Sequence, residues 1–397
     1  MPALQPTPLD HADPDETFLA EVRAFLAEAL TPDLREAGRR TLGVHSDIAA
    51  CRLWHQRLHR RGWIAPGWPV AHGGAGWTPR QRFLFDRECA LNDAPVLFAG
   101  GIRSLGPLII EMGTAMQQAR YLPAILSGED LWAQGFSEPG AGSDLARVAT
   151  RAVRQGERYV IDGSKIWTTG AHLSNRMFAL VRTQTGEKPQ HGLTFLLLDM
   201  ASPGLTVSPI ITLDGEHELN AVFFDQVSVP VANRIGEEGQ GWAVAKRLMQ
   251  LARSNNTPAA LVRRVYQRAR AAALAATDLE PGLWARLVAA EIELTAFEQT
   301  ELALLPGGRL REGDSTSPSV LKLIGSELHQ RVAELAMEIA GALRGPALEP
   351  FRETDGLLAD SARATAKHFA TRAASIYSGS SETQRNVIAQ ALSPRDR

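Results

Sequence analysis

The segment Gln134-Gly-Phe-Ser-Glu-Pro-Gly-Ala-Gly-Ser-Asp144 lies where the hydrophobic pattern of the chain changes from helical to strand spacing. Its glycines and small hydroxyl side chains let backbone N–H groups come close to an anion, as a phosphate-bearing ligand requires. The glycine spacing matches neither the Walker loop nor the dinucleotide-binding loop. Taken alone, the segment is explained equally well by a structural turn.

The two flanks of this segment carry different hydrophobic periods. Before it, from Phe18 to about Glu129, apolar residues recur at helical spacing and predict a helical domain. After it, β-branched and aromatic runs predict a compact β domain, with two short strands at 159–161 and 165–167 around a hairpin turn at Asp162-Gly163. Further strands are predicted at 194–198, 205–211 and 222–229.

Helical spacing returns after Gly239-Gln-Gly241. It predicts four long helices, at about 242–276, 283–305, 320–342 and 357–376, and a shorter one from about Ser381. Four long amphipathic helices in sequence are typical of a bundle. Residues 305–318, rich in Gly, Ser and Pro, are interpreted as an inter-helix loop.

The composition excludes several classes of protein. The 397 residues carry 42 Lys and Arg against 44 Asp and Glu, so no basic field indicates nucleic acid. Cys51 and Cys89 are the only cysteines, which excludes a disulfide scaffold and favours a reduced, cytoplasmic location. No apolar run reaches transmembrane length, and residues 1–16 are interpreted as a loose arm because they lack the pattern of a signal peptide. We therefore expect a soluble protein that binds neither nucleic acid nor membranes.

Two further motifs carry aromatic and polar side chains at the ends of predicted elements. In Lys165-Ile-Trp-Thr-Thr169, the Trp face can pack on a planar ring such as isoalloxazine, and the Thr hydroxyls can bond its polar edge. Ile376-Tyr-Ser-Gly-Ser-Ser-Glu-Thr-Gln-Arg385 places a Gly-Ser turn before the last helix, whose N-terminus attracts anions. Taken singly, a core Trp and a plain helix cap explain the same residues.

In their order, the three motifs and the domains between them resemble the acyl-CoA dehydrogenase family over nearly the whole chain. Gly62-Trp-Ile-Ala-Pro-Gly-Trp-Pro69 and Gly73-Gly-Ala-Gly-Trp77 are similar to the branch that contains pimeloyl-CoA and steroid side-chain dehydrogenases. The resemblance implies an α+β fold with an N-terminal α-helical domain at 1–132, a middle β-barrel-like domain at 133–238 and a C-terminal four-helix bundle at 239–397.

The resemblance also implies roles for individual residues. FAD is the expected cofactor, contacted by Phe136, Ser137, Gly142, Ser143, Trp167, Thr168, Thr169, Ser380 and Glu382. Glu338 and Gly341 are expected at the adenine end of a neighbouring subunit's FAD, where Glu338 replaces the usual Gln and Ala342 a second Gly. The expected contacts of an acyl-CoA thioester are Ser143, Arg253 and Gly379, and no metal is implied. A homo- or hetero-tetramer and an electron-transfer flavoprotein or similar acceptor are the expected partners.

The family's catalytic base is absent from both places where the resemblance puts it. That base is a glutamate, which takes the α-proton of the thioester while hydride leaves the β-carbon. In many members it precedes the Gly of the terminal turn, where this chain has Ser378, and in others it precedes a helix arginine, where this chain has Ala252. A serine without a neighbouring base is too weak a proton acceptor. The N–H of Ser378 can still polarise the thioester carbonyl.

Histidine is another side chain that can serve as a base or a metal ligand near neutral pH. The histidines of this chain, however, show no ligand spacing and are predicted to be structural or surface residues: His45, His55, His59, His172 and His368 among them. The ordinary mechanism has therefore lost its base.

The segment after Arg253 also departs from the family. Ser254-Asn-Asn-Thr-Pro258 places poor helix formers and a proline inside a predicted helix, which Pro258 should kink or end. An altered pocket, with Asn255 or Asn256 facing a different ligand, and simple decay explain this segment equally well. Three functions stay open: an acyl-CoA dehydrogenase with impaired or altered activity, a non-catalytic subunit of a heteromeric dehydrogenase, and a flavoprotein with other chemistry such as desulfination or oxygen activation. A cofactor-free binding module is a fourth.

Overall fold

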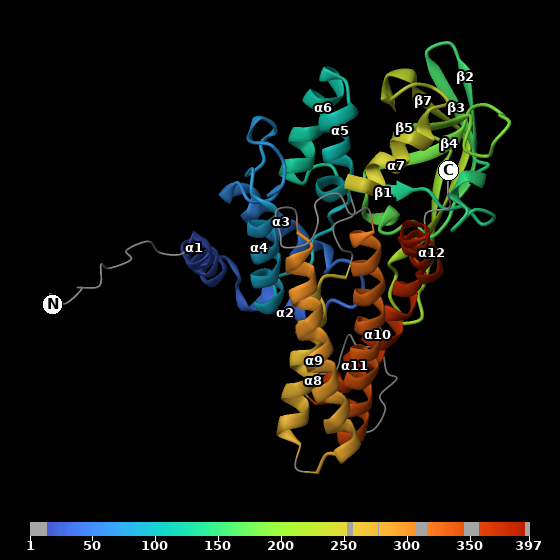
Figure 1. Ribbon diagram of the computed structural model, residues 1–397. Coiled ribbons are helices and arrows are strands. Elements are labelled where there is room, and N and C mark those ends of the chain that lie inside the picture. The colour runs from blue at the N-terminus through green and yellow to red at the C-terminus, as the bar shows by residue number, and fades with distance from the viewer. Residues whose placement is uncertain (1–13, 252–256, 277, 306–315, 345–356, 394–397) are drawn as a thin grey trace, which may run out of the picture.

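The chain forms two helical parts with a β-sheet between them in sequence. The computed structural model describes residues 14–251, 257–276, 278–305, 316–344 and 357–393. Figure 1 shows helices α1 to α6 beside the sheet and a bundle of long helices that extends away from both, with α12 running alongside the bundle near the sheet. The predicted α+β arrangement, with helical domains before and after a β domain, is confirmed.

The N-terminal part is helical because its sequence supplies helix caps around an aromatic core. Thr78 and Thr114 each cap a helix with their hydroxyl group, and the Gln three residues later bonds back to the capping residue. Trp54, Trp63 and Trp68 are buried between the helices. The helices are α1 Pro14–Ala29, α2 Pro32–Arg40, α3 Ile48–Arg61, α4 Pro79–Leu91, α5 Gly106–Met112 and α6 Ala115–Ser127.

The middle part is one eight-stranded sheet within residues 132–235. Its strands run in the order β6-β7-β3-β2-β4-β5-β8, and β1 pairs with β4. The strands are β1 Trp132–Gly135, β2 Arg151–Gln155, β3 Arg158–Lys165, β4 Arg176–Arg182, β5 Leu193–Asp199, β6 Leu205–Ile210, β7 Leu219–Pro230 and β8 Arg234–Ile235.

The hairpin turn predicted at Asp162-Gly163 is wrong. β3 runs through both residues, and its pairing with β7 only shifts register there, between Ile161 and Gly163. The side chain and backbone of Gln226 bond to the Asp162 carboxylate beside this β-bulge. The actual hairpin joins β2 to β3, where Gln155 pairs with Arg158 across a two-residue loop. An Asp-Gly pair therefore marks an irregular strand here, because Gly163 adopts a φ of 140°.

β4 and β5 are buried on both faces, which fixes the sheet between two cores. Alternate residues such as Phe178 and Phe195 pack toward the N-terminal helices and α7 Gly241–Leu251. The intervening residues, such as Met177 and Leu196, pack into a second core with strands β3 and β7. The N-terminal helices and the sheet consequently form one packed body.

The C-terminal bundle has its own core. Val262, Phe297, Leu328 and Ile339 are buried between α8, α9 and α10. The interruption predicted at Pro258 is confirmed, since α8 begins after Pro258, which occupies the N-cap. The remaining helices are α8 Ala259–Ala275, α9 Pro281–Ala303, α10 Ser317–Arg344, α11 Leu357–Thr371 and α12 Ser381–Leu392.

Two sequence interpretations concern segments that are only partly described. The loose arm expected at residues 1–16 is wrong for its last three residues, because α1 begins at Pro14, and residues 1–13 lie outside the described residues. The loop expected at 305–318 ends earlier, since Ser317 opens α10, and residues 306–315 lie outside the described residues.

We expect Gly163→Ala to lower the free energy of unfolding by about 1–3 kcal/mol. Gly163 has φ 140°, and an added Cβ would lie 2.8 Å from the Thr150 Cα. Gly156→Asn is the matched control, because Gly156 has φ 59° in the β2–β3 turn and open space around it, a conformation that Asn tolerates. Urea denaturation of both variants measures the difference. Equal stability would contradict the assignment of a bulge to Gly163.

Candidate active site

The first motif leaves the sheet at the end of β1. Phe136 is buried, Ser137 is half-buried, and Glu138 and Ala141 close a tight turn through two backbone hydrogen bonds. Beyond the turn, Gly142 and Ser143 are exposed, and a Cβ added to Gly142 would meet no atom within 4 Å. The glycine loop therefore presents open backbone to the surface, which suits close approach by an anionic group.

A buried ion pair joins the first motif to the second. The Lys165 Nζ, which is fully buried, donates to the Glu138 Oε1 at 2.7 Å and to the carbonyls of Phe136 at 3.1 Å and Leu180 at 2.6 Å. The Glu138 carboxylate also accepts the backbone N–H groups of Ala149 and Thr150. Burial lowers the pKa of Lys165 to about 8, although Glu138 opposes the shift. The ammonium and the carboxylate thus satisfy each other's hydrogen bonds in the interior.

The second motif follows β3 and presents an indole to the surface. Trp167 has φ 59°, a left-handed conformation that is uncommon for a non-glycine residue, and the residue is 57% exposed. Thr168 is buried, and its Oγ1 has no hydrogen-bond partner among the described residues. Thr169 is half-buried. An exposed aromatic face beside an unpaired buried hydroxyl indicates that a group with an apolar face and a polar edge completes this site.

The third motif forms the turn between α11 and α12. Ser378 has φ 57° and Gly379 has φ 87°, and the Ser380 Oγ caps α12 by accepting the N–H of Thr383. Ser378 and Glu382 are exposed. Hydrogen bonds at the start of α12 lower the pKa of the Glu382 carboxyl. The turn therefore offers exposed backbone N–H groups at a helix N-terminus.

Two polar atoms beside this turn are buried without a partner among the described residues. They are the Ser381 Oγ at the first residue of α12 and the Lys322 Nζ on the neighbouring helix α10. Burial lowers the pKa of the Lys322 ammonium, and Glu327 and Glu382 oppose the shift. An unpaired cation near a helix N-terminus is favourable only beside negative charge, so this corner suits an anionic ligand group.

Glu218 connects the third motif to the second. Its backbone carbonyl accepts the N–H of Gly170 at 2.8 Å, directly after the Trp167–Thr169 segment. Burial and the nearby Glu218 carboxylate raise the pKa of the Tyr377 phenol, next to Ser378, to about 12. Glu218 therefore lies close to residues of both motifs.

Other predicted site residues lie elsewhere or outside the described part. Glu338 on α10 pairs with Arg286 of α9, and a Cβ on Gly341 would meet no atom within 4 Å. Neither contacts the three motifs, so their expected contact with a neighbouring subunit's cofactor stays a prediction. Ala252 and Arg253 fall within residues 252–256, which lie outside the described residues.

Sequence reasoning missed the residues that hold the motifs in place. Asn220 is fully buried and bonds to Thr168, and Lys367 donates to the Leu42 carbonyl and lies near Glu218. Burial and nearby arginines lower the pKa of Lys367 to about 7. The sequence signal for these residues is an Asn at a buried strand position, Asn220, because a buried side-chain amide needs hydrogen-bond partners.

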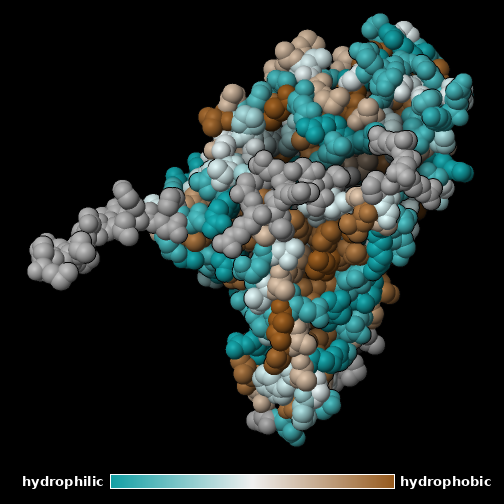
Figure 2. Space-filling model, in the orientation of Figure 1, coloured by the Kyte–Doolittle hydropathy of each residue, from teal (hydrophilic) through white to brown (hydrophobic). Residues whose placement is uncertain are grey.

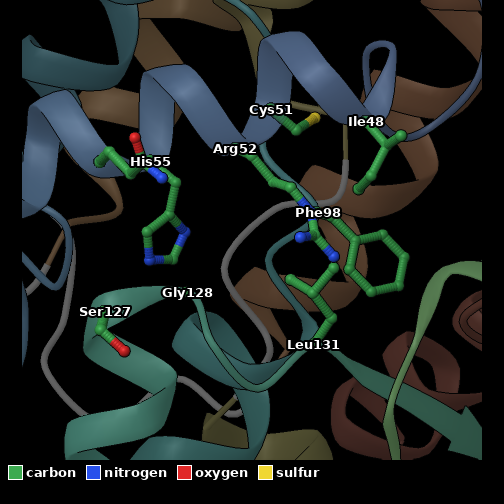
Figure 3. Close-up of a pocket in the computed structure, with 9 residues that line it drawn as sticks. Ile48, Cys51, Arg52, His55, Phe98, Ser127, Gly128 and Leu131 are labelled. Carbon is green, nitrogen blue, oxygen red and sulfur yellow. The ribbon is translucent and has the colours of Figure 1, made fainter.

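A separate cavity lies in the N-terminal part, between α3 and the end of α6 (Figure 3). It has a volume of about 50 Å³ and is lined by residues that include Cys51, Arg52 and Phe98. His55 is bonded to the Leu126 carbonyl, and burial raises the pKa of the Cys51 thiol to about 11. The cavity is therefore too small for a nucleotide and contains no activated nucleophile.

The described ranges contain neither a metal-binding cluster nor a membrane-spanning helix. No group of three His, Cys, Asp or Glu side chains there is arranged to hold a metal ion. None of the helices described is both long and apolar enough to cross a membrane.

Comparison with known families gives three matches in order along the chain. They are the acyl-CoA dehydrogenase N-terminal domain at residues 13–129, the middle domain at 133–227 and the C-terminal domain at 239–393. Acyl-CoA dehydrogenase IpdE1 from Mycobacterium tuberculosis is 37% identical over 386 residues, which cover 94% of this chain and 96% of that protein. Acyl-CoA dehydrogenase FadE26 from the same organism is 32% identical, covering 84% of this chain and 86% of its own length.

Two solved structures are similar over almost the entire chain. The ChsE4-ChsE5 complex from Mycobacterium tuberculosis has a TM-score of 0.82 and 28% identity, covering 98% of this chain and 100% of that one. The Tcur3481-Tcur3483 steroid acyl-CoA dehydrogenase has a TM-score of 0.80 and 27% identity, covering 97% and 99%. The steroid branch inferred from the glycine- and tryptophan-rich segments is confirmed by these similarities.

We expect Lys165→Met to lower the free energy of unfolding by about 3–5 kcal/mol, because the Glu138 carboxylate would stay buried without its cation. Lys246→Met on the exposed surface of α7 is the matched control and should change stability by less than about 0.5 kcal/mol. Urea denaturation measures both. A Lys165→Met protein as stable as the control would show that the ion pair does not hold the two motifs together.

Proposed function

Since the chain belongs to the acyl-CoA dehydrogenase family, we propose that it is an FAD-dependent oxidoreductase that acts on the α,β carbon–carbon bond of an acyl-CoA thioester. The observation that carries this proposal is the Trp167–Thr169 segment, where an exposed indole lies beside a buried hydroxyl that lacks a partner among the described residues. A flavin has the apolar face and the polar edge that these two side chains require.

The cofactor of this family is FAD, which accepts hydride when it is bound. In this chain Trp167 would cover the ring face, and Thr168, Thr169, Phe136 and Ser137 would surround its edge. Gly142, Ser143, Ser380 and Glu382 would approach its polar chain. The buried Ser381 hydroxyl and the Lys322 ammonium support an anionic group near the start of α12.

The proposed substrate is an acyl-CoA thioester held near the Ser378–Gly379 turn and Ser143, with Arg253 as a further contact. The Ser378 backbone N–H would polarise the thioester carbonyl, a role that needs no particular side chain. Electrons would leave to an electron-transfer flavoprotein or a similar acceptor. Without a carboxylate at Ser378 or Ala252, we expect turnover roughly 10²- to 10⁴-fold slower than with one.

The Glu218 carboxylate lies near Tyr377 but does not replace the absent base. Its Oε1 accepts the N–H of Val44 at 3.1 Å, and its Oε2 packs so closely on Gly43 that an added Cβ there would lie 1.6 Å away. The carboxylate is therefore committed to the junction with the N-terminal part. This commitment supports impaired or altered dehydrogenation as the function of the isolated chain.

A second candidate is a subunit of a heteromeric dehydrogenase that binds ligands but leaves catalysis to its partner. The missing base favours it, and so does the similarity to the ChsE4-ChsE5 and Tcur3481-Tcur3483 pairs. Apolar side chains are also exposed on the bundle, and Figure 2 shows a hydrophobic strip along it. They include Leu274 of α8 and Val288 and Ile292 of α9, each more than half exposed.

Two experiments separate these candidates. Anaerobic titration of the purified chain with a panel of acyl-CoAs, read as bleaching of the flavin absorbance, reports cofactor, ligand and competence together. A chain that neither carries nor takes up FAD would overturn both. Co-expression with a homologue that retains a glutamate before its helix arginine tests the second candidate, which fails if the two never co-purify and the isolated chain oxidises acyl-CoA alone.

We expect Ser378→Glu to raise the rate of flavin reduction by an acyl-CoA by roughly 10²- to 10⁴-fold, because it supplies a carboxylate as general base. Ser378→Gln is the matched control, since it has the same length without the charge. Stopped-flow absorbance under anaerobic conditions measures both rates. If Glu is no faster than Gln, the turn does not face the α-carbon of the substrate.

A further inference from the structure

Asn220 is the residue that holds the Trp167–Thr169 segment against β7. It is fully buried, its backbone carbonyl accepts the Thr168 N–H at 2.9 Å, and its Nδ2 donates to the Thr168 carbonyl at 3.0 Å. Two residues on, Gly170 bonds to the Glu218 carbonyl and packs against Phe98. Asn220 therefore bonds both backbone groups of Thr168, the N–H through its own backbone carbonyl and the carbonyl through its buried side-chain amide.

Two histidines complete the hydrogen bonds of that amide. The His172 Nδ1 lies 3.1 Å from the Asn220 Nδ2, and the His217 Nε2 lies 2.8 Å from the Asn220 Oδ1. The two imidazole rings stack on each other, with centroids 3.8 Å apart and an interplanar angle of 16°. We call Asn220, His172 and His217 the Asn220 junction.

The hydrogen-bond pattern assigns a protonation state to His172. The Thr168 carbonyl can only accept, so the Asn220 Nδ2 must face it, and the same NH₂ group then faces the His172 Nδ1. Because two donors cannot bond each other, the His172 Nδ1 must be unprotonated and its ring neutral. The His217 Nε2 must carry a proton, since it faces the Asn220 Oδ1.

We propose that the Asn220 junction positions the Trp167–Thr169 segment for its ligand and releases it in acid, when a proton on the His172 Nδ1 displaces the Asn220 amide. His172 and Asn220 are positioning residues, which act through Thr168. The link to FAD rests on the proposed function above, whereas the acid-sensitive contact between Asn220 and Thr168 does not.

The charges around His172 favour its neutral form. His217 and His45 are the titratable groups close enough to affect it, and burial together with both imidazoles lowers the pKa of His172 below its ordinary value. His45 in turn opposes the rise that burial causes in the pKa of the Glu218 carboxyl. β1 and β6, which also pack near residues 171–173, carry no titratable side chain, and Asp225 of β7 lies five residues beyond Asn220.

The sign of the pH dependence follows from the lowered pKa. In the unfolded chain His172 takes up a proton near its ordinary pKa of about 6.5, whereas the folded junction resists it to lower pH. The stabilisation by the junction is therefore fully present above about pH 6.5 and is lost as pH falls through the folded pKa.

Hydrogen exchange at the Thr168 amide of the full chain tests the proposal. After correction for intrinsic exchange, we expect protection to fall roughly tenfold between pH 8 and pH 5. Loss of the bond from the Asn220 Nδ2 to the Thr168 carbonyl would free the segment, and with it the bond from the Thr168 N–H to the Asn220 backbone carbonyl. His172→Phe keeps an aromatic ring on His217 but has no nitrogen to protonate, so its protection should not change with pH. His59→Phe, at an exposed position on α3, is the matched control and should keep the wild-type profile.

Two results would overturn the proposal: constant Thr168 protection in the wild type over this range, or a wild-type pH profile in His172→Phe. The dissociation constant for FAD, measured by flavin fluorescence, should rise in parallel with the loss of protection and become independent of pH in His172→Phe. A chain that binds no FAD at any pH would contradict the proposed function, while the exchange profile would still decide whether the junction releases Thr168.

Discussion

The ion pair between Lys165 and Glu138 is the constraint on which the candidate site depends. Both charges lie in the interior, where an isolated ammonium or carboxylate would be strongly unfavourable, so neither side chain can leave without the other. Because Glu138 belongs to the glycine loop and Lys165 ends β3, this pair fixes the loop to the strand that leads into Trp167. The ion pair thus joins the glycine loop and the exposed indole into one unit.

Trp167 and Ser378, the two residues expected beside the ligand, both have a strained backbone. Trp167 and Ser378 are two of the four non-glycine residues with positive φ in the described chain. Such conformations persist only where the surroundings hold them. Asn220 and Glu218 hold the segment around Trp167 through hydrogen bonds to Thr168 and Gly170. The turn around Ser378 is held by the cap of α12 and by Gln384, which donates to the Gly379 carbonyl. The strain is therefore supported by residues outside both motifs.

The sequence predicts the architecture well because helix spacing, proline breaks and the three motifs are local signals, as the start of α8 after Pro258 shows. The prediction from sequence is wrong at Asp162-Gly163, because this residue pair is typical of a turn but lies in a β-bulge. Only the pairing of β3 with β7 distinguishes the bulge from a turn. The sequence cannot reveal the Asn220 junction, because Asn220 and Thr168 are separated by 52 residues and meet only through the sheet. Long-range pairing leaves no periodic trace in one chain.

The buried thiol beside the small cavity has a practical consequence for chemistry on this chain. With a pKa of about 11, Cys51 is present as thiolate in roughly one molecule in ten thousand at pH 7, and only the thiolate reacts with electrophiles. Burial raises the pKa of Cys89 as well. Both native thiols should therefore stay inert toward maleimides. One cysteine introduced on the surface can then carry a fluorophore or spin label at a single chosen position.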